Sequence, residues 1–365
     1  MTRPAQCPIT GMTARAFVIP TDAPESDGTI AWDSTTMVTA TVEAGGKTGF
    51  GYTYCDQAAA ALCRGVLAKA VDGCDAMDIQ AAWDAMNRAV RNIGRPGIAS
   101  CAISAIDVAL WDLKAKLLGI PLALLLGRAR QAVHVYGSGG FTSYDTARIE
   151  QQLAGWATQG CRWVKMKVGR HPADDTARVQ AAKRAIGDAV LFVDANGAYA
   201  RKQALAFADA FAASGVSWFE EPVSSDDLEG LRLLRNRAPA GMTIAAGEYG
   251  YSPYYFLEML AAGAVDVLQA DATRCGGITG FLRAAALADG FQIPLSSHCA
   301  PALHCAPASA APRFLHMEWF HDHVRIEQML LEGVPDLKDG EVAPDLSSPG
   351  HGLSLRQAEA ERFAV

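Results

Sequence analysis

Apolar and polar residues alternate along the first part of the chain. Over residues 12–54 the alternation is interrupted by glycines, including the pair Gly45 and Gly46. A period of two with such breaks is typical of strands joined by tight turns. Residues 56–127 instead repeat with helical periodicity. We therefore predict an α+β domain over residues 1–127, in which helices follow an antiparallel meander.

From Val133 onward, short apolar runs alternate with alanine-rich helical stretches. The runs are Val133–Val135, Trp163–Val168, Leu191–Val193, Val216–Phe219, Thr243–Ala245, Val265–Leu268 and Ile293–Leu295. Alternation of strand and helix predicts a parallel α/β sheet. We place this second domain at residues 128–330 and treat residues 331–365 as a C-terminal segment.

Ionisable side chains follow or close these runs at a spacing of one per repeat. They are Lys165 and Lys167, Asp194, Glu220, Glu248, Asp271, His298 and Glu318. In a barrel of eight strand–helix units, catalytic groups come from the carboxyl ends of successive strands. The sequence therefore predicts an α/β barrel in which these groups converge on one mouth. Solvated charges at the starts of loops are the alternative interpretation.

Three carboxylates, on Asp194, Glu220 and Glu248, end consecutive predicted strands. Pointing into one cavity they would repel one another unless a hard cation lay between them. Mg²⁺ prefers six oxygen ligands and keeps positions open for water or substrate. We therefore expect Mg²⁺ as the cofactor.

Lys165 and Lys167 lie two residues apart, so a strand places both ammonium groups on one face. A neighbouring cation and burial both favour the neutral form, which would let a lysine act as a base. His298 follows a later apolar run, and Asp271 precedes it by one strand. We expect Asp271 to hold the imidazole and raise its basicity. A pair of surface lysines and a structural histidine are the alternatives.

The composition limits the function. The chain has 365 residues, half of them apolar, and a net charge of −7. No cluster of lysine and arginine predicts a nucleic-acid partner, and no apolar stretch predicts a membrane span, so the expected partner is a small molecule. Nine scattered cysteines and the absence of an apparent secretory signal favour a reducing, cytoplasmic location.

Two other metal motifs are present. His298-Cys299 and His304-Cys305 contain zinc-ligand residue types but lack paired CxxC spacing, so a zinc site is not expected. His321-Asp322-His323 has the HxH spacing of metallohydrolase barrels, yet it follows the last catalytic position, so we assign it a structural role.

Several segments of the chain, taken together, resemble one protein family. The residues that carry the resemblance are Ala109–Leu113, Lys165 with Lys167, Asp194–Asn196, Glu220–Pro222, Gly247-Glu248, Asp271 before Cys275–Gly277, and Ser297-His298. The chain resembles the mandelate racemase subgroup of the enolase superfamily over nearly its whole length. The resemblance implies a (β/α)7β TIM-like barrel with an N-terminal capping domain that the C-terminal tail completes. It also implies a homo-oligomer.

The resemblance also implies individual roles. Asp194, Glu220 and Glu248 would bind Mg²⁺. Lys167 would be the base on one face of the substrate, with Lys165 lowering its pKa and touching the substrate carboxylate. His298 with Asp271 would serve the opposite face, and Glu318 would hydrogen-bond the developing enediolate.

Acid-sugar dehydratases are common among proteins with this full set of residues, so the resemblance implies a sugar acid as the substrate. By this analogy we expect removal of the proton next to its carboxylate and dehydration to a 2-keto-3-deoxy acid. Racemisation, epimerisation or cycloisomerisation is the main alternative, and a non-catalytic binding protein is a remote one. The substrate is expected to contact residues of the cap and of the barrel strand ends, with Trp32 packing against a sugar face. These residues are Trp32, Tyr52, Tyr54, Ser138 and Asn196.

Overall fold

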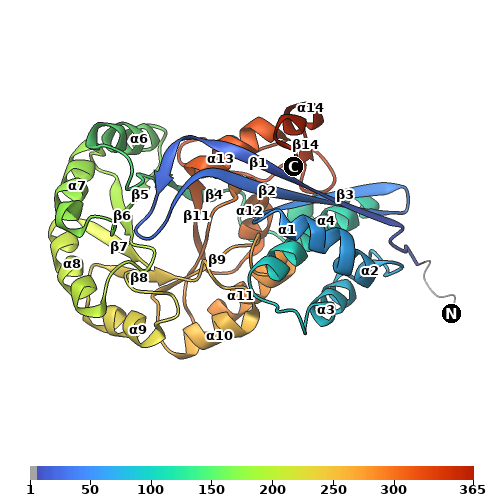
Figure 1. The fold of residues 1–365 in the computed structure, drawn as a ribbon, viewed down its shortest axis with the longest axis horizontal. Helices are drawn as coiled ribbons and strands as arrows, with labels where there is room; N and C mark the ends of the chain where they lie inside the picture. Colours follow the sequence, from blue (N-terminus) through green and yellow to red (C-terminus); the bar gives the residue numbers. More distant parts are fainter. Residues whose placement is uncertain (1–5) are drawn as a thin grey trace.

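A computed structural model describes residues 6–365 and divides them between a capping domain and a barrel (Figure 1). The capping sheet has three antiparallel strands in the order β1 (Gly11–Ser26), β2 (Ala31–Ala44) and β3 (Lys47–Tyr54). Gly45 and Gly46 join β2 to β3 with φ of 55° and 70°, the conformation that a two-residue hairpin turn requires. The predicted meander over residues 12–54 is confirmed.

Six helical segments follow the meander. They are α1 (Ala58–Leu62), a π-helical turn (Cys63–Leu67), α2 (Ala68–Val71), α3 (Ile79–Ala89), α4 (Ile98–Leu118) and α5 (Leu122–Leu126). Helix α4 packs against β2 and β3 on one side and against a barrel helix on the other. It is therefore buried over most of its circumference and joins the two domains.

The barrel contains eight parallel strands. They are β4 (Val133–Gly139), β5 (Trp163–Lys167), β6 (Val190–Asp194), β7 (Val216–Glu220), β8 (Thr243–Ala246), β9 (Val267–Ala270), β10 (Leu295–Ser297) and β11 (Phe314–Phe320). Neighbouring strands pair in chain order, and β11 pairs with β4 through Glu318 opposite Tyr136. The sheet is therefore closed, as predicted.

Helices connect consecutive strands and form the outer layer of the barrel (Figure 1). They are α6 (Thr146–Thr158), α7 (Pro172–Ala185), α8 (Arg201–Ala213), α9 (Leu228–Arg237), α10 (Pro253–Ala261), α11 (Gly277–Gly290) and α12 (Pro301–Ala310). The main core lies between strands and helices. Inside the barrel, the rings of Phe192 and Trp218 stack at 5.0 Å, and those of Tyr136 and His316 meet edge to face at 4.8 Å.

The chain returns to the cap after the barrel. Helix α13 (His321–Leu330) follows β11, and the tail then forms β12 (Leu331–Glu332), β13 (Glu341–Val342), β14 (Ser354–Leu355), α14 (Gln357–Ala360) and a 3₁₀ turn (Glu361–Phe363). Arg15 of β1 contacts Glu361 at 2.7 Å, and Phe17 bridges to Ala364. The domain limits at residues 127 and 330 stay a prediction.

Two sequence-based expectations can be compared with the structure, namely that the cysteines form no disulfide framework and that no segment spans a membrane. All nine cysteines are free. Among residues 6–365, none of the helices combines the length and apolar character needed to cross a bilayer.

Candidate active site

The barrel strands bring the eight predicted ionisable residues to one end of the barrel. Lys165 and Lys167 lie on β5, Asp194 and Glu220 end β6 and β7, and Glu318 lies on β11. The others follow β8, β9 and β10, and they are Glu248, Asp271 and His298. All eight are almost completely buried. Their proximity follows from the parallel topology, which places every strand's carboxyl end on the same rim.

Three of these residues form a candidate metal centre. Carboxylate oxygens of Asp194, Glu220 and Glu248 lie within 4.8 Å of one another. Glu248 Oε2 is buried and has no hydrogen-bond partner among residues 6–365. Burial and the charge of Asp194 raise the pKa of Glu220 to about 8. An oxygen-only donor set with an unsatisfied buried carboxylate fits a hard divalent cation such as Mg²⁺.

Both lysines contact these carboxylates. Lys165 Nζ lies 2.6 Å from Glu220 Oε1 and 2.8 Å from Glu318 Oε1, and Lys167 Nζ lies 2.5 Å from Asp194 Oδ2. Burial alone would lower the pKa of each ammonium, but the carboxylates outweigh it and raise the pKa of both lysines. The sequence-based expectation of a lowered pKa considered the neighbouring ammonium and omitted the carboxylates from the adjoining strands.

His298 and Asp271 form a buried pair. His298 Nδ1 lies 2.8 Å from Asp271 Oδ2, while the other oxygen of Asp271 accepts hydrogen bonds from the backbone and the hydroxyl of Thr273. Burial opposes a charged imidazole, yet Glu248 and Asp271 raise the pKa of His298 overall. With Nδ1 held by Asp271, the Nε2 atom lies 3.4 Å from Glu248 Oε2.

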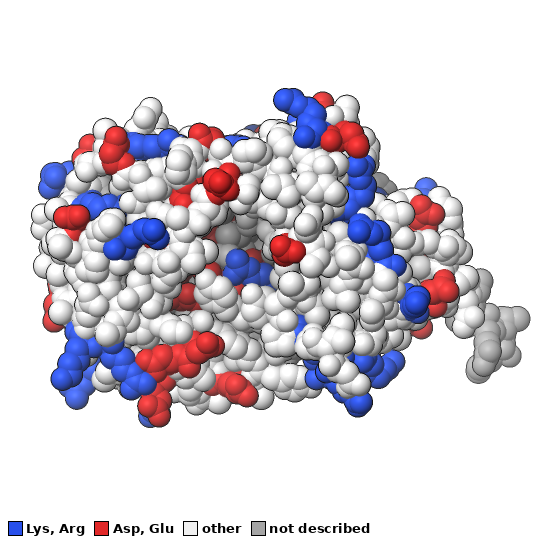
Figure 2. Space-filling view, in the orientation of Figure 1, with Lys and Arg blue, Asp and Glu red and all other residues white. Residues whose placement is uncertain are grey.

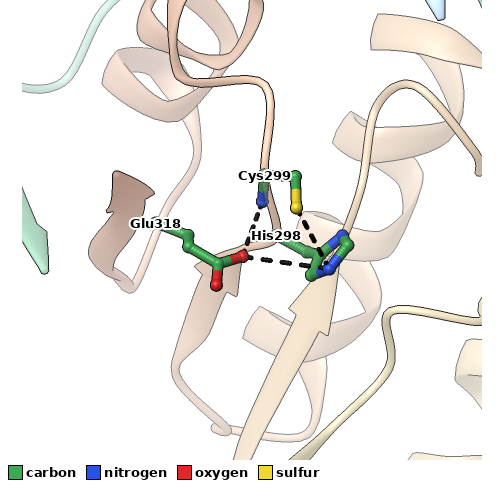
Figure 3. Close-up of side chains that lie close together, drawn as sticks. All are labelled: His298, Cys299 and Glu318. Carbon is green, nitrogen blue, oxygen red and sulfur yellow. Dashed lines mark hydrogen bonds and ion pairs between the residues drawn. The ribbon is translucent and has the colours of Figure 1, made fainter. Parts of the chain in front are cut away.

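Glu318 is held from three directions. Its Oε1 accepts a hydrogen bond from Ser138 and contacts Lys165, and its Oε2 accepts one from the backbone N–H of Cys299. Figure 3 shows Glu318 beside Cys299 and His298, with Cys299 Sγ 3.2 Å from His298 Nε2. The Lys165 ammonium is the main cause that lowers the pKa of Glu318 against the effect of burial, so this carboxylate stays ionised.

A cavity of about 470 Å³ opens between the cap and the barrel mouth. Figure 2 shows it as a hollow near the middle of this face, where atoms of basic and acidic residues meet. Lys167, Glu248, Asp271 and His298 line the cavity. The remaining four residues are buried and are absent from its lining, and they are Lys165, Asp194, Glu220 and Glu318.

The five predicted substrate contacts separate into two groups. Trp32, Tyr54 and Asn196 line the cavity. Tyr52 does not, because its hydroxyl donates to Glu327 Oε1 within the protein core. Ser138 also lies outside the lining, where it donates to Glu318. Tyr52 and Ser138 are therefore placed to support other residues.

Unsatisfied polar atoms mark the cavity as a binding site. Three buried atoms of residues that line the cavity have no hydrogen-bond partner in the described part of the chain, and they are Tyr54 Oη, Asn196 Oδ1 and Glu248 Oε2. Such atoms are rare in folded proteins, because leaving them unpaired costs free energy. A polar ligand in the cavity would satisfy them.

Several residues that line the cavity were not predicted from the sequence as site residues. Arg274 lies 3.5 Å from Glu248 and 3.7 Å from Asp271, and its guanidinium faces the Tyr249 ring. His323 stacks on Tyr54 at 3.5 Å. Arg274 comes three residues after Asp271, a predicted site residue, so its place in the sequence could have indicated that it lies near the site. His323 belongs to the HxH motif, and its Nδ1 accepts a hydrogen bond from the backbone of Ala300.

Comparison with known proteins places the chain in a family. The family model of the mandelate racemase/muconate lactonizing enzyme N-terminal domain matches residues 10–127, and the enolase C-terminal domain-like model matches residues 148–360. The fold is similar to that of a mandelate racemase/muconate lactonizing enzyme-like protein from Rubrobacter xylanophilus. That chain is 51% identical, with a TM-score of 0.96 and coverage of 98% of this chain and 100% of the other.

Two relatives represent different reactions. A 3,6-anhydro-alpha-L-galactonate cycloisomerase from Streptomyces coelicolor is 35% identical over 90% of this chain and 91% of its own. An L-talarate dehydratase from Polaromonas sp. JS666, solved with Mg and L-glucarate, is 33% identical, with a TM-score of 0.89 and coverage of 98% of both chains. The magnesium in that structure agrees with the sequence-based expectation of Mg²⁺. The chain belongs to the mandelate racemase/muconate lactonizing enzyme family of the enolase superfamily.

Proposed function

We propose that the protein is a magnesium-dependent enzyme that removes the α-proton of a sugar acid and dehydrates it to a 2-keto-3-deoxy acid. The observation that carries the proposal is that Lys167 and His298 enter one cavity beside the carboxylate cluster. Lys167 approaches the cluster at Asp194, and His298 approaches it at Glu248. As proton-transfer groups, these two residues would flank one binding position.

The α-proton of a carboxylate is a weak acid, so its removal requires stabilisation of the enediolate as charge develops. Bound by Asp194, Glu220 and Glu248, Mg²⁺ would offset the charge of these carboxylates and act as a Lewis acid toward the substrate carboxylate. Lys165 would add a buried positive charge, which Glu220 and Glu318 hold in place.

Once the charge of Asp194 is offset, burial and the Lys165 ammonium would favour the neutral amine of Lys167. In the proposed reaction, Lys167 Nζ accepts the proton from C2 in this neutral form. His298 Nε2 donates a proton to the hydroxyl at C3, which leaves as water when the C3–O bond breaks. The resulting enol tautomerises to the 2-keto-3-deoxy acid. Asp271 keeps the His298 ring oriented throughout, since it holds Nδ1 at 2.8 Å.

Similarity to relatives supports a sugar acid as the substrate. It also supports a second candidate reaction. The L-talarate dehydratase was solved with L-glucarate, which favours dehydration. The cycloisomerase from Streptomyces coelicolor, similar over nine-tenths of this chain, favours isomerisation. The same base and acid would serve either reaction, because the two differ in what leaves C3 after the α-proton is removed.

Proton NMR in deuterated buffer with Mg²⁺ tests the proposal against a library of aldonic acids, aldaric acids and their anhydro and lactone forms. A deuterated methylene beside a new ketone from an aldonic or aldaric acid establishes dehydration. The same product from an anhydro acid or a lactone indicates cycloisomerisation, and exchange or inversion at C2 alone favours racemisation or epimerisation. The matched controls are Lys167→Met, which removes the base, and Lys202→Met, which removes an exposed lysine of α8. Turnover unchanged by Lys167→Met would contradict the proposal.

A further inference from the structure

A second group of metal-ligand side chains lies where the cap meets the barrel, outside the cavity lining. Asp22 and Glu25 belong to the end of β1, and His321 is the first residue of α13. One ligand atom from each lies within 4.8 Å of the others. Asp22 and Glu25 lie in the cap, about 300 positions before His321 in the sequence, so only the docked cap brings them close to it.

The spacing of Asp22 and His321 matches that of two ligands of one ion. Asp22 Oδ2 and His321 Nε2 are hydrogen-bonded at 3.1 Å, a contact that a cation bound by both atoms would replace. Two atoms that each lie about 2.1 Å from a cation in tetrahedral or similar geometry are about 3.0–3.4 Å apart. Arg148 lies 3.5 Å from the other oxygen, Oδ1, so it leaves Oδ2 available to the cation.

Glu25 provides an independent indication of a ligand. Its side chain is 1% exposed. Its Oε2 accepts a hydrogen bond from Trp32 Nε1 at 2.8 Å, but its Oε1 is buried and has no hydrogen-bond partner within residues 6–365, the part that the structure describes. A buried carboxylate oxygen without a partner is costly. Consistent with this, burial and the charges of Asp322 and Asp22 raise the pKa of Glu25 to about 8.

We propose that Asp22, Glu25 and His321 bind a divalent transition-metal ion of the Zn²⁺ type. The donor set contains an imidazole nitrogen, which suits Zn²⁺ and its neighbours in the first transition row, whereas Mg²⁺ selects oxygen ligands. Three protein ligands with water in the fourth position is a common zinc arrangement. The site is therefore chemically distinct from the oxygen-only cluster at the barrel mouth.

The ion would fasten the β1–β2 hairpin to the barrel. Trp32 lines the active-site cavity and is hydrogen-bonded to Glu25. His321 directly follows Phe320, which also lines the cavity. A cation shared by Glu25 and His321 therefore holds one wall of the cavity against the other. Its removal is expected to loosen the cap and leave the barrel intact.

Metal analysis of the whole protein tests the site without reference to activity. The metal-free chain is saturated with Mg²⁺, dialysed against Zn²⁺ at low micromolar concentration, and analysed for bound zinc. We expect one equivalent of zinc in the wild type, and its loss in Glu25→Gln and in His321→Gln. His321 is partly exposed, so its variant is expected to fold even if Glu25→Gln does not.

Cys299→Ser is the matched control, because His298, Cys299 and Glu318 form another cluster of possible ligands. Co²⁺ in place of Zn²⁺ adds a spectroscopic test, since a thiolate ligand gives a charge-transfer band that the proposed site lacks. Zinc retained in Cys299→Ser, without a thiolate band, supports the site, as does a zinc-dependent rise in Tm that both ligand variants lose. No bound zinc in the wild type, or zinc unaffected by both ligand variants, would overturn the proposal.

Discussion

His298 Nδ1 and Asp271 Oδ2 lie 2.8 Å apart in a buried pair, and the second oxygen of Asp271 is held by Thr273. The carboxylate thus fixes both the tautomer and the orientation of the ring, and it leaves Nε2 directed toward Glu248. A histidine constrained in this way can give or take a proton only at Nε2.

Asp271→Asn is expected to lower kcat about 100-fold, the lower range of what a general acid contributes, with a smaller change in KM. The amide keeps the volume of the side chain but loses the charge that stabilises an imidazolium. Thr273→Val is the control, because it removes one hydrogen bond to Asp271 and keeps the contact with His298. Steady-state kinetics would contradict the pairing if both variants lost the same activity.

Lys167→Met and His298→Asn are expected to fail at different steps. Without Lys167 the substrate should show no deuterium exchange at C2. Without His298 the exchange should persist, because Lys167, the proposed base, would still remove the proton, while the deoxy product should fall by about 100-fold or more. NMR in deuterated buffer follows both signals at once. Exchange that survives in Lys167→Met would assign the base to another residue.

Glu248→Gln is expected to weaken Mg²⁺ binding at least tenfold, about 1.4 kcal/mol, because it removes the charge of a proposed ligand whose Oε2 has no hydrogen-bond partner among residues 6–365. Isothermal titration with Mg²⁺ measures the change. Glu258→Gln, at an exposed position of α10, controls for the loss of one negative charge. Equal affinities in the two variants would mean that Glu248 is not a ligand.

His316 makes stability depend on pH. It lies inside the barrel, where burial lowers its pKa to about 3 from the ordinary 6.5. Below pH 6.5 the unfolded chain gains a proton that the folded protein does not accept until about pH 3. The free energy of unfolding therefore falls as the pH decreases through this range, by up to about 1.4 kcal/mol per pH unit.

Urea denaturation between pH 6.5 and 5 tests this effect. His316→Phe is expected to cost about 1 kcal/mol at pH 7, because Ser296 loses a hydrogen-bond partner, and to reduce the pH dependence. His134→Phe, at an exposed position on β4, should leave the slope unchanged. An equal slope in wild type and His316→Phe would refute the assignment.

Gly28 sets how closely the cap approaches the barrel. A Cβ atom there would lie 2.4 Å from the carbonyl oxygen of Ala195 and 2.7 Å from that of Val168. Gly28→Ala should therefore displace the hairpin, raise KM and cost about 1–3 kcal/mol of stability. Gly65→Ala is the control, because a Cβ at that position meets nothing within 4 Å. Unchanged KM in Gly28→Ala would show that the hairpin adjusts without loss.

The residues at the strand ends were predictable from the sequence, because a parallel barrel brings every carboxyl end to one rim regardless of side-chain detail. The positions of side chains in the capping domain were harder to predict. Tyr52 and Tyr54 share one face of β3, yet Tyr52 reaches Glu327 whereas Tyr54 reaches the cavity. Their positions along the strand and the docking of α13 decide this difference, and neither is encoded in local periodicity.

The charge state of the lysines also depended on distant residues. Sequence spacing identified the repulsion between Lys165 and Lys167, but Glu318 lies about 150 positions further along the chain. Its contact with Lys165 exists only in the closed barrel, at 2.8 Å. Partners that topology brings together determined the pKa directions, so local sequence could not.

The pairing of β11 with β4 has a consequence for synthesis on the ribosome. Strand β4 is synthesised about 180 residues before β11, so the barrel cannot close until β11 has also been synthesised. Until then the Lys165 ammonium lacks Glu318, and the edge of β4 is open to other strands. The nascent chain therefore passes through a stage at which its hydrophobic interior is exposed, and a chaperone that shields the β4 edge at this stage should raise the yield of folded protein.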